Sequence, residues 1–437
     1  MYEYDDRSNI TSVIELKNNT KIYEETNTYN DLNQLTNQII AINNTTYECL
    51  YFYDENSNLI AHGINKTKEN GISAIENICF SEYAFNSQNE MVTQTIGSES
   101  ISNLYHNIYQ TLGRPNLYKG YEFGYNFDNL EYMENGKYRI IYTYNSQGIR
   151  TSKQVTNKME NKTTLTKYVL EGNLIIKEIV TGDENYTVNY HYDKNNELVG
   201  FTYNNENYSY IKDLQGNINK IVDDEGDVMV EYYYSGYGIL LNSIDNSNIN
   251  LSNINPFRYR GYYQDKETLF YYLNARFYDS DAGRFITMDD ISYLGESNTV
   301  CSYNLFTYCE NNPIMYVDES GHAMTSVLIK NTINNKESYF DDKDERDNLI
   351  SYTFNETNHF KKVNSSLFEG ISNLYCANPK INVPTDTEKF VTTYFSNAAS
   401  LYVDSYSTRG SGGAAGFGKI VVTLYDIDKY YDAFCIY

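Results

Sequence analysis

The chain has 437 residues, of which 34 are basic and 58 acidic, giving a formal net charge of −24 at neutral pH. An acidic surface repels phosphate backbones, so the composition argues against nucleic-acid binding by the bulk of the protein. The acidity is uneven, because residues 322–437 carry 11 basic and 14 acidic residues, a net charge of −3, and are freer to meet an anionic target.

The first residues contain neither a basic region nor an apolar run, so they do not resemble a secretory signal peptide. No stretch approaches the roughly 18 apolar residues that a membrane helix needs. Six cysteines are scattered along the chain with no Cys-x-x-Cys pair. This spacing predicts free buried thiols rather than a disulfide scaffold or a zinc ribbon.

A short repeat occupies the first 250 residues. Each unit is a tyrosine, a polar turn rich in Asp, Asn and Gly, and an aliphatic residue that opens the next strand; copies begin at Tyr4, Tyr29, Tyr53, Tyr144 and Tyr192. Adjacent copies follow one another at about 24 residues, as supersecondary repeats do. Asn, Asp and Gly tolerate the positive φ of tight turns, so the repeat predicts a succession of β-hairpins.

Between the turns the sequence alternates at period two. Tyr186, Val188 and Tyr190 share one face of a predicted strand, and residues 228–234 follow the same scheme. Such alternation is typical of half-buried antiparallel strands. Repeated hairpins with little other core predict a sheet that coils into a solenoid or shell. A short helix over residues 99–112 is expected to interrupt this sheet.

Residues 255–290 interleave aromatic residues with arginine more densely than any other segment. The arginines are Arg258, Arg260, Arg276 and Arg284. Because the surrounding chain is acidic, we expect these arginines to pair internally rather than to capture a ligand.

The repeats and this segment together resemble the RHS/YD-repeat proteins. The resemblance is carried by NPFRYRG (255–261), YYLNARFYD (271–279) and GRFI (283–286), which are similar to the RHS repeat-associated core. It implies degenerate YD/RHS repeats over residues 1–184, the core over 185–321 and a variable C-terminal domain over 322–437. The implied fold is mainly β: an antiparallel YD/RHS-repeat β-sheet spiral, a partial cocoon, followed by a small α+β domain.

The resemblance also implies a function, in which the core presents a C-terminal effector, often a toxin used in bacterial competition. Members are thought to release the effector by aspartate-dependent self-cleavage, here near residue 322. The matching positions are Arg284, Asp289 and Asp318, with Asp290 as an alternative carboxylate. Two carboxylates that share a proton serve as acid and base, and an arginine polarises the scissile carbonyl.

The chain departs from the family pattern at this site. The proline that follows each aspartate in the family is missing, and His322 replaces a frequent leucine. Proline fixes φ, so its loss loosens the backbone next to the acids. The alternative interpretation is that Arg284 and the aspartates form a buried ion-pair network that holds the core in place.

The C-terminal piece has a different pattern. Helical spacing predicts helices over residues 341–354, 365–377 and 387–402, and apolar runs predict strands over 420–425 and 433–437. A glycine-rich loop at 413–418, flanked by Arg409 and Lys419, is either a plain connection or a cover over a substrate. His359 with Lys361 suits metal-independent RNA cleavage, in which imidazole moves a proton and ammonium steadies phosphate, or is ordinary surface.

Two classes of function are compatible with these patterns. One is the delivered effector, with an immunity protein as its expected partner and an upstream RHS/YD segment or secretion machinery as further partners. The other is a non-enzymatic surface or adhesion protein whose sheet binds glycans or a protein. We expect secretion or surface attachment as part of a larger RHS protein, or a cytoplasmic location for an orphan cassette. H-E-x-x-H, Cys/His-cluster and G-x-S-x-G motifs are missing, so neither a metal site nor a cofactor is expected.

Overall fold

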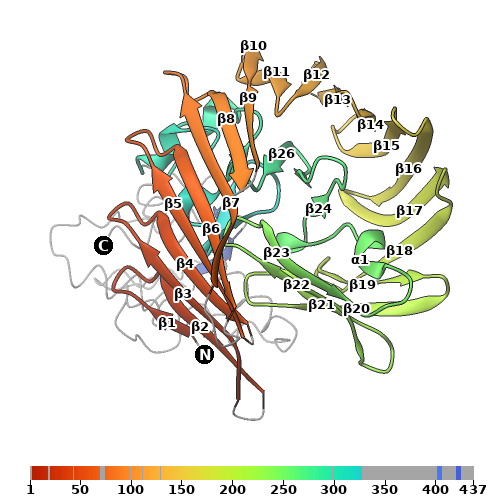
Figure 1. The fold of residues 1–437 in the computed structure, drawn as a ribbon, viewed down its shortest axis with the longest axis horizontal. Coiled ribbons are helices and arrows are strands. Elements are labelled where there is room, and N and C mark those ends of the chain that lie inside the picture. Colours follow the sequence, from red (N-terminus) through yellow and green to blue (C-terminus); the bar gives the residue numbers. More distant parts are fainter. Residues whose placement is uncertain are drawn as a thin grey trace, which may run out of the picture. The chain divides into compact units, whose positions relative to one another are not determined.

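A computed structural model describes residues 2–326, except 18–19, 43, 69–73, 99–100, 111, 128 and 298, together with residues 401–405 and 420–424. The chain divides into two units, Met1–Ala323 and Met324–Tyr437. In the first unit, consecutive strands pair antiparallel in two large sheets (Figure 1). No helix among the described residues is long and apolar enough to cross a membrane.

The first sheet has nine strands in chain order. They are β1 (Tyr2–Tyr4), β2 (Ile10–Lys17), β3 (Thr20–Tyr29), β4 (Leu35–Ile42), β5 (Thr45–Tyr53), β6 (Leu59–Lys68), β7 (Ala74–Phe85), β8 (Met91–Ser98) and β9 (Ile101–His106).

The second sheet has fourteen strands, also in chain order. They are β10 (Ile108–Gln110), β11 (Arg114–Tyr118), β12 (Tyr121–Asn126), β13 (Asn129–Glu134), β14 (Tyr138–Tyr144), β15 (Arg150–Asn157), β16 (Lys162–Glu171), β17 (Leu174–Gly182), β18 (Tyr186–Tyr192), β19 (Leu198–Tyr203), β20 (Glu206–Lys212), β21 (Ile218–Val222), β22 (Val228–Tyr234) and β23 (Leu240–Asp245). The sheet continues without a break across residue 184, because β17 pairs with β18.

The core segment that follows is built from short elements. They are α1 (Leu251–Ile254), η1 (Tyr259–Gly261), β24 (Tyr263–Gln264), β25 (Tyr271–Leu273), β26 (Arg276–Asp279), β27 (Arg284–Phe285), η2 (Ile291–Tyr293), η3 (Cys301–Tyr303), η4 (Cys309–Asn311) and β28 (Tyr316–Asp318). Strands β24–β27 form a small antiparallel sheet. Figure 1 shows this segment lying between the strands of the two large sheets.

The repeat turns close by the same hydrogen bonds each time. Oδ1 of Asp54 accepts from the backbone N–H groups of Asn56 at 2.9 Å and Asn58 at 2.8 Å, and Ser57 between them has φ 61°. Positive φ recurs at the corresponding place in other turns, at Asn33, Asn89, Gly148 and Asn196. Asp and Asn therefore start these turns because their side chains satisfy backbone donors that the ladder leaves free.

The repeat tyrosine ties each turn to the preceding hairpin. The hydroxyl of Tyr53 donates to the carbonyl oxygen of Leu35 at 2.5 Å. The same bond recurs in four pairs, Tyr29 to Ile10, Tyr144 to Leu130, Tyr192 to Ile175 and Tyr234 to Ile218. Tyrosine recurs here because its ring packs inside the sheet while its hydroxyl satisfies a carbonyl that the ladder does not use.

The strands predicted from alternation are confirmed, since residues 186–192 form β18 and 228–234 form β22. The helix predicted over residues 99–112 is wrong, because β9 pairs with β8 and β10 pairs with β11. In these strands the side chain of Leu104 is 61% exposed, and Ile108 is also exposed. The open edge of β8 offers backbone partners that outweigh local propensity.

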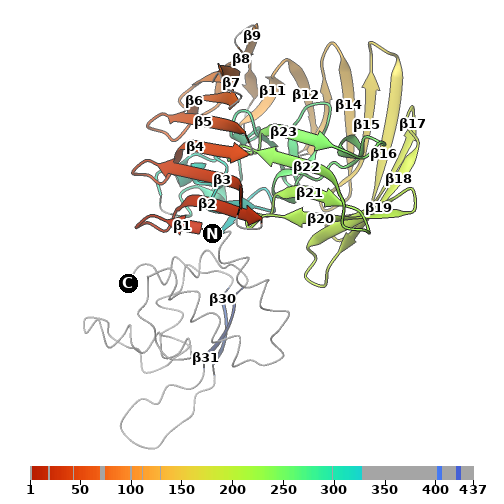
Figure 2. The same ribbon diagram turned by 60° about the horizontal axis from the view of Figure 1, so that its bottom comes forward.

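The strands curve back, so that late strands meet early ones (Figure 2). In the turn between β22 and β23, the backbone N–H of Gly236 donates to Oε1 of Gln38 in β4 at 2.6 Å. The hydroxyl of Tyr237 in the same turn lies 2.7 Å from that of Tyr53 in β5. The expected curved shell around a core is thus present in the first unit.

In the second unit, the described strands are β29 (Met324–Ser326), β30 (Leu401–Ser405) and β31 (Ile420–Leu424), and β30 pairs antiparallel with β31. Strand β31 confirms the strand predicted at 420–425. Strand β30 takes the last two residues of the helix predicted over 387–402, which is therefore wrong at that end. The remaining predictions for 341–354, 365–377 and 433–437 lie outside the described residues.

The arginines of the core segment bind inside the unit, as expected. Arg258 donates to the carbonyl of Ser252 at 2.5 Å, and Arg260 donates to the carbonyls of Gln215 and Pro313. None of the four cysteines in the described first unit forms a disulfide, also as expected; Cys49, Cys301 and Cys309 are buried, and Cys79 is half-buried.

A fully buried ion pair fastens the core to the second sheet. The Arg150 guanidinium in β15 bonds both carboxylate oxygens of Asp265, at 3.0 and 2.9 Å, and both side chains have no exposed surface. The guanidinium also lies over four tyrosine rings, the nearest being Tyr272 at 4.3 Å and Tyr263 at 4.7 Å. Burial alone would raise the pKa of Asp265, but Arg150 and Lys153 hold it below its ordinary value.

Replacing Asp265 by Asn tests this fastening. The substitution leaves Arg150 buried without a counter-charge, so we expect a loss of about 3–5 kcal/mol in the free energy of unfolding. Chemical denaturation at neutral pH measures the loss. Because folding lowers the pKa of Asp265, the difference between the two proteins should shrink as the pH falls below about 4.

The matched control is Lys266→Ala, which removes the exposed Lys266–Glu184 pair (3.2 Å) close by. An exposed pair contributes about 0–1 kcal/mol. Equal effects of the two substitutions would contradict the role given to Asp265.

Candidate functional site

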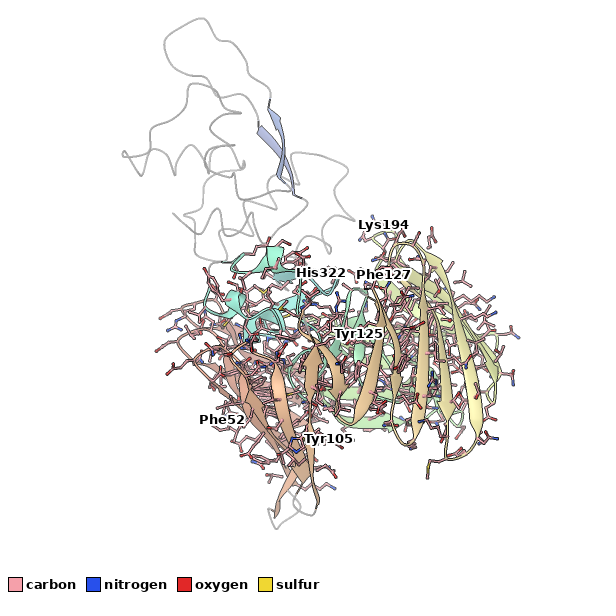
Figure 3. All side chains as sticks on the ribbon, turned by 90° about the horizontal axis from the view of Figure 1, so that it is seen from above. Phe52, Tyr105, Tyr125, Phe127, Lys194 and His322 are labelled. Carbon is pink, nitrogen blue, oxygen red and sulfur yellow. The ribbon has the colours of Figure 1, made fainter. Side chains whose placement is uncertain are left out.

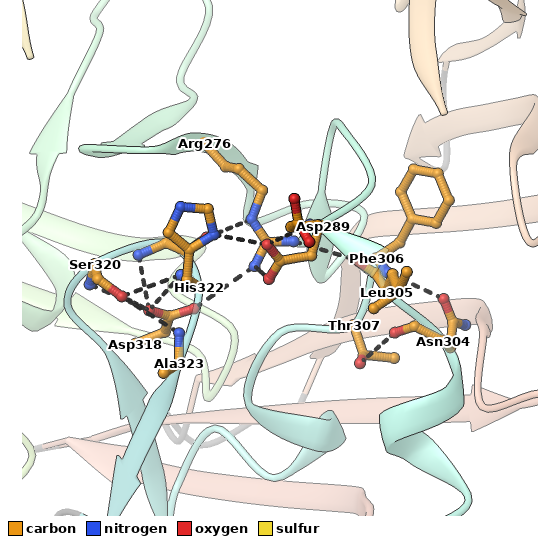
Figure 4. A network of polar contacts seen from close by, with 12 residues as sticks. Arg276, Asp289, Asn304, Leu305, Phe306, Thr307, Asp318, Ser320, His322 and Ala323 are labelled. Atoms are coloured by element: carbon orange, nitrogen blue, oxygen red, sulfur yellow. Dashed lines mark hydrogen bonds and ion pairs between the residues drawn. The ribbon is translucent and has the colours of Figure 1, made fainter. Parts of the chain in front are cut away.

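The candidate site forms where three parts of the core segment meet (Figure 4). Arg276 opens β26, Asp289 follows β27, and Asp318 ends β28. His322 lies in the turn after Asp318, at one rim of the first unit and away from Tyr105 and Phe52 (Figure 3). The site is therefore assembled by the small inner sheet and the last turn of the unit.

Arg276 joins the two aspartates. One of its terminal nitrogens lies 2.7 Å from Oδ2 of Asp289 and 3.8 Å from Oδ2 of Asp318. All three side chains are buried. Its other terminal nitrogen donates to the carbonyl of Leu305 at 3.0 Å, which fixes the plane of the guanidinium. The fourth contact is from Nε of Arg276 to the backbone carbonyl oxygen of Gly321.

The turn after Asp318 folds over its own carboxylate. Oδ1 of Asp318 accepts from three backbone N–H groups, those of Ser320 at 3.2 Å, Gly321 at 2.8 Å and His322 at 3.2 Å. Gly321 has φ 79°, and a Cβ there would lie 2.4 Å from the carbonyl oxygen of Leu273. Only glycine therefore lets the chain pass this close to the inner sheet.

The electrostatics of the two acids differ. Burial, with a smaller contribution from the nearby Asp289 charge, raises the pKa of Asp318 to about 6, although Arg276 and the backbone donors oppose the shift. Burial also lowers the pKa of Arg276 from its ordinary value, with the aspartates opposing that shift. A protonated Asp318 beside an Asp289 that is paired with a cation is the arrangement that acid–base work requires.

His322 is part of this constellation. Its Nδ1 lies 2.6 Å from Oδ1 of Asp289, and its ring stacks on Tyr293 with 5.5 Å between centroids and 7° between planes. Asp289 thus contacts Arg276 with one oxygen and His322 with the other.

The sequence predicted that Asp289 and Asp318 belong to one site, and the structure places them together. It predicted Arg284 as their arginine, whereas Arg276 makes the contacts. Arg284 donates to Oδ1 of Asn58 at 3.3 Å and to the carbonyl of Asn89 at 2.6 Å, so it clamps the core to two repeat turns. The reason is register: Arg284 in β27 lies opposite Asp279 in β26, at the other end of that strand from Arg276.

The alternative acid, Asp290, points to the surface. Its Oδ1 accepts from the backbone N–H of Ser292 at 2.8 Å, which caps η2 and lowers the pKa of Asp290. Arg276 belongs to the motif YYLNARFYD that carries the family resemblance, but spacing alone gave it no role. The candidates His359, Lys361, Arg409 and Lys419 lie outside the described residues.

A group of metal-ligating side chains lies elsewhere, between β6, β7 and the core segment. It consists of His62, Cys79 and Asp281, which is the one such group among the described residues.

Comparisons with known proteins agree with this architecture. No family model matches the chain. It is 29% identical over 227 residues to the tRNA3(Ser)-specific nuclease WapA of Bacillus spizizenii, which covers 46% of this chain and 9% of that protein. It is 30% identical over 188 residues to the tRNA nuclease WapA of Bacillus subtilis, which covers 43% of this chain and 8% of that protein.

The fold is that of a solved toxin structure. The crystal structure of TcdB2-TccC3 superposes with a TM-score of 0.52 at 16% identity, over 73% of this chain and 18% of that one. The chain thus spans less than a tenth of the WapA proteins and less than a fifth of TcdB2-TccC3. Hairpins closed by tyrosine and aspartate, an inner core sheet and these likenesses together identify the chain as an RHS/YD-repeat protein.

Proposed function

We propose that the first unit is a shell and core that presents the C-terminal segment as a toxin and releases it by self-cleavage at the Arg276–Asp289–Asp318 site. The observation that carries the proposal is one buried arginine, Arg276, between Asp289 and Asp318. The peptide group of residues 321–322 contacts both Arg276 and Asp318.

The geometry favours the bond between Gly321 and His322. Nε of Arg276 donates to the carbonyl oxygen of Gly321 and would stabilise the charge that develops there. The nitrogen of the same peptide, that of His322, lies 3.2 Å from Oδ1 of Asp318. Protonated Asp318 is therefore placed to give its proton to the leaving amine.

The remaining step belongs to Asp289. As a carboxylate it takes a proton from the attacking water, whose oxygen bonds to the carbonyl carbon of Gly321. Collapse of the tetrahedral intermediate breaks the C–N bond as Asp318 protonates the nitrogen, and the two acids end with their proton exchanged. His322 steadies the negative charge of Asp289 at 2.6 Å.

Asp318→Asn and Asp289→Asn are expected to slow self-cleavage by about 100- to 10,000-fold, since each removes one proton-transfer group. Intact mass of the purified full chain over time measures the loss. Asp290→Asn is the matched control and should cleave at the wild-type rate, because Asp290 only caps η2. A wild-type chain that stays intact after long incubation at pH 5 to 7 would end the protease proposal.

The pH dependence follows from the same acids. Only protonated Asp318 donates, and its pKa is about 6. The cleavage rate is therefore expected to fall about tenfold per pH unit above that value and to level off below it. A rate that rises steadily through pH 8 would remove Asp318 from the role of acid.

The new N-terminus identifies the bond. Cleavage at Gly321–His322 leaves His322 first in the released fragment, and mass spectrometry of the fragment detects it. A fragment that begins at Ala323 would move the reacting carbonyl one residue onward, out of reach of the contact that Arg276 makes, and would contradict its assigned role.

The released segment is proposed to be an enzyme that acts on RNA. The support is the name of the WapA relatives, tRNA nucleases, together with the near-neutral charge of residues 322–437. His359 and Lys361 are the proposed proton-transfer and phosphate-binding groups, and Arg409 and Lys419 the further cations. An immunity protein is the proposed partner, and delivery out of the producing cell is the proposed route.

Expression of residues 322–437 in a bacterial cell is expected to arrest growth and to degrade tRNA, which gel analysis of total RNA detects. His359→Ala should restore growth at equal protein level, whereas His322→Ala should not. Harmless expression together with retained surface binding by residues 1–321 would favour the adhesion alternative.

A further inference from the structure

Three side chains that could bind a metal meet where the core segment touches the first sheet. His62 lies in β6, Cys79 in β7, and Asp281 between β26 and β27. Their ligand atoms all lie within 4.8 Å of one another. They come from positions far apart in the sequence, and the self-cleavage site uses none of them.

The spacing of these atoms suits a single small cation. Nε2 of His62 is 3.3 Å from Oδ1 of Asp281, and Sγ of Cys79 is 3.8 Å from the same oxygen. Bond lengths of about 2.0–2.2 Å to nitrogen and oxygen and about 2.3 Å to sulfur give tetrahedral ligand–ligand edges of about 3.3–3.6 Å. The two distances to Oδ1 of Asp281 are thus close to the edges of a zinc tetrahedron.

Neighbouring groups hold Asp281 in this orientation. Its Oδ2 accepts from Nζ of Lys119 and from Nε2 of Gln94, each at 3.0 Å. Its backbone carbonyl accepts from the hydroxyl of Tyr83 at 2.5 Å. Oδ1, which also accepts from the hydroxyl of Ser81 at 3.1 Å, is directed at His62 and Cys79, and outer contacts of this kind orient a metal ligand.

His62 has polar contact on one side only. Its side chain is 1% exposed, and Nδ1 is buried with no hydrogen-bond partner in the described part of the chain. The ring is held between Tyr51 and Tyr83. Nε2 is therefore the ring nitrogen that meets the carboxylate of Asp281, and it is the atom that a metal would bind.

The charges around the group also suit a divalent ion. Lys119 is paired with Asp279 at 2.8 Å as well as with Asp281, so its positive charge is already offset. A metal ion binds cysteine as the thiolate, so the proton of Cys79 would leave to the solvent on binding. With the thiolate formed, the three anions Asp279, Asp281 and Cys79 balance Lys119 and one divalent cation.

We propose that His62, Cys79 and Asp281 bind one Zn²⁺, which ties the core segment to the nine-stranded sheet. Mixed sulfur, nitrogen and carboxylate ligands select zinc over Mg²⁺ or Ca²⁺. The site is a fastening of the shell rather than part of the cleavage chemistry. It joins β6 and β7 to the loop between β26, which carries Arg276, and β27, which carries Arg284.

Cobalt titration of the full-length chain, stripped of metal with a chelator, tests the site. We expect uptake of one Co²⁺ per chain with a near-ultraviolet thiolate-to-cobalt absorption band, displaced by Zn²⁺, and a higher unfolding temperature with zinc bound. Cys79→Ser should abolish the band and the zinc-dependent rise. Gln94→Leu, which removes one of the two donors to Oδ2 of Asp281 but keeps all ligands, should weaken binding about 10- to 100-fold.

Cys301→Ser is the matched control, since Cys301 is another free buried thiol, in η3. It should keep the band, the stoichiometry and the rise in unfolding temperature. The unfolding temperatures of the metal-free variants establish that each one folds. Absence of stoichiometric uptake by the wild-type chain, or an unchanged band in folded Cys79→Ser, would overturn the proposal.

Discussion

The structure depends on how a polar core segment is held inside a curved sheet. The buried Arg150–Asp265 pair shows the constraint most clearly, because neither charge could remain inside without the other. Four tyrosine rings surround the guanidinium, and two of its nitrogens, which have no hydrogen-bond partner, lie among these rings. The position of the core relative to the second sheet is therefore set by a specific contact and not by general hydrophobic burial.

Other buried ion pairs and hydrogen bonds also hold the core segment to the strands around it. Asp279 and Asp281 meet Lys119 from the turn between β11 and β12, and Arg284 reaches the turns at Asn58 and Asn89. Each contact joins the core to a different group of strands. Since consecutive hairpins touch mainly their neighbours, these contacts, together with those of Gly236 and Tyr237 to β4 and β5, link distant repeats to one another.

The candidate site is another of these buried polar contacts, but it contains one arginine and two aspartates. Arg276 serves two aspartates, so one of them has less counter-charge than burial demands, and its pKa rises. At the Arg150 clamp, by contrast, Arg150 and Lys153 lower the pKa of Asp265 against the effect of burial. An acid kept close to its protonated form beside a backbone carbonyl is the feature that separates the site from the clamps.

Local signals in the sequence predicted the strands of the shell well. These signals depend only on neighbours two to four residues away, so they can be recognised in the sequence itself. They are the alternation over residues 186–192 and 228–234 and the Asp and Asn turns. The helix predicted over residues 99–112 was wrong because the unpaired edge of β8, and not the local spacing of Ile101 and Leu104, decides the conformation of this segment.

By itself the sequence determined the repeat, the turns, the family and the two aspartates of the site, because each depends on local pattern or on a motif. Only the tertiary structure decided that Arg276 and not Arg284 serves those aspartates, since both occupy similar aromatic–arginine stretches and strand register separates them. It also decided that His322 contacts Asp289 and that residues 62, 79 and 281 converge. These contacts join residues that lie 33 to 219 positions apart, and they produce no recognisable pattern in the sequence. They arise from the curvature of the sheet around its core.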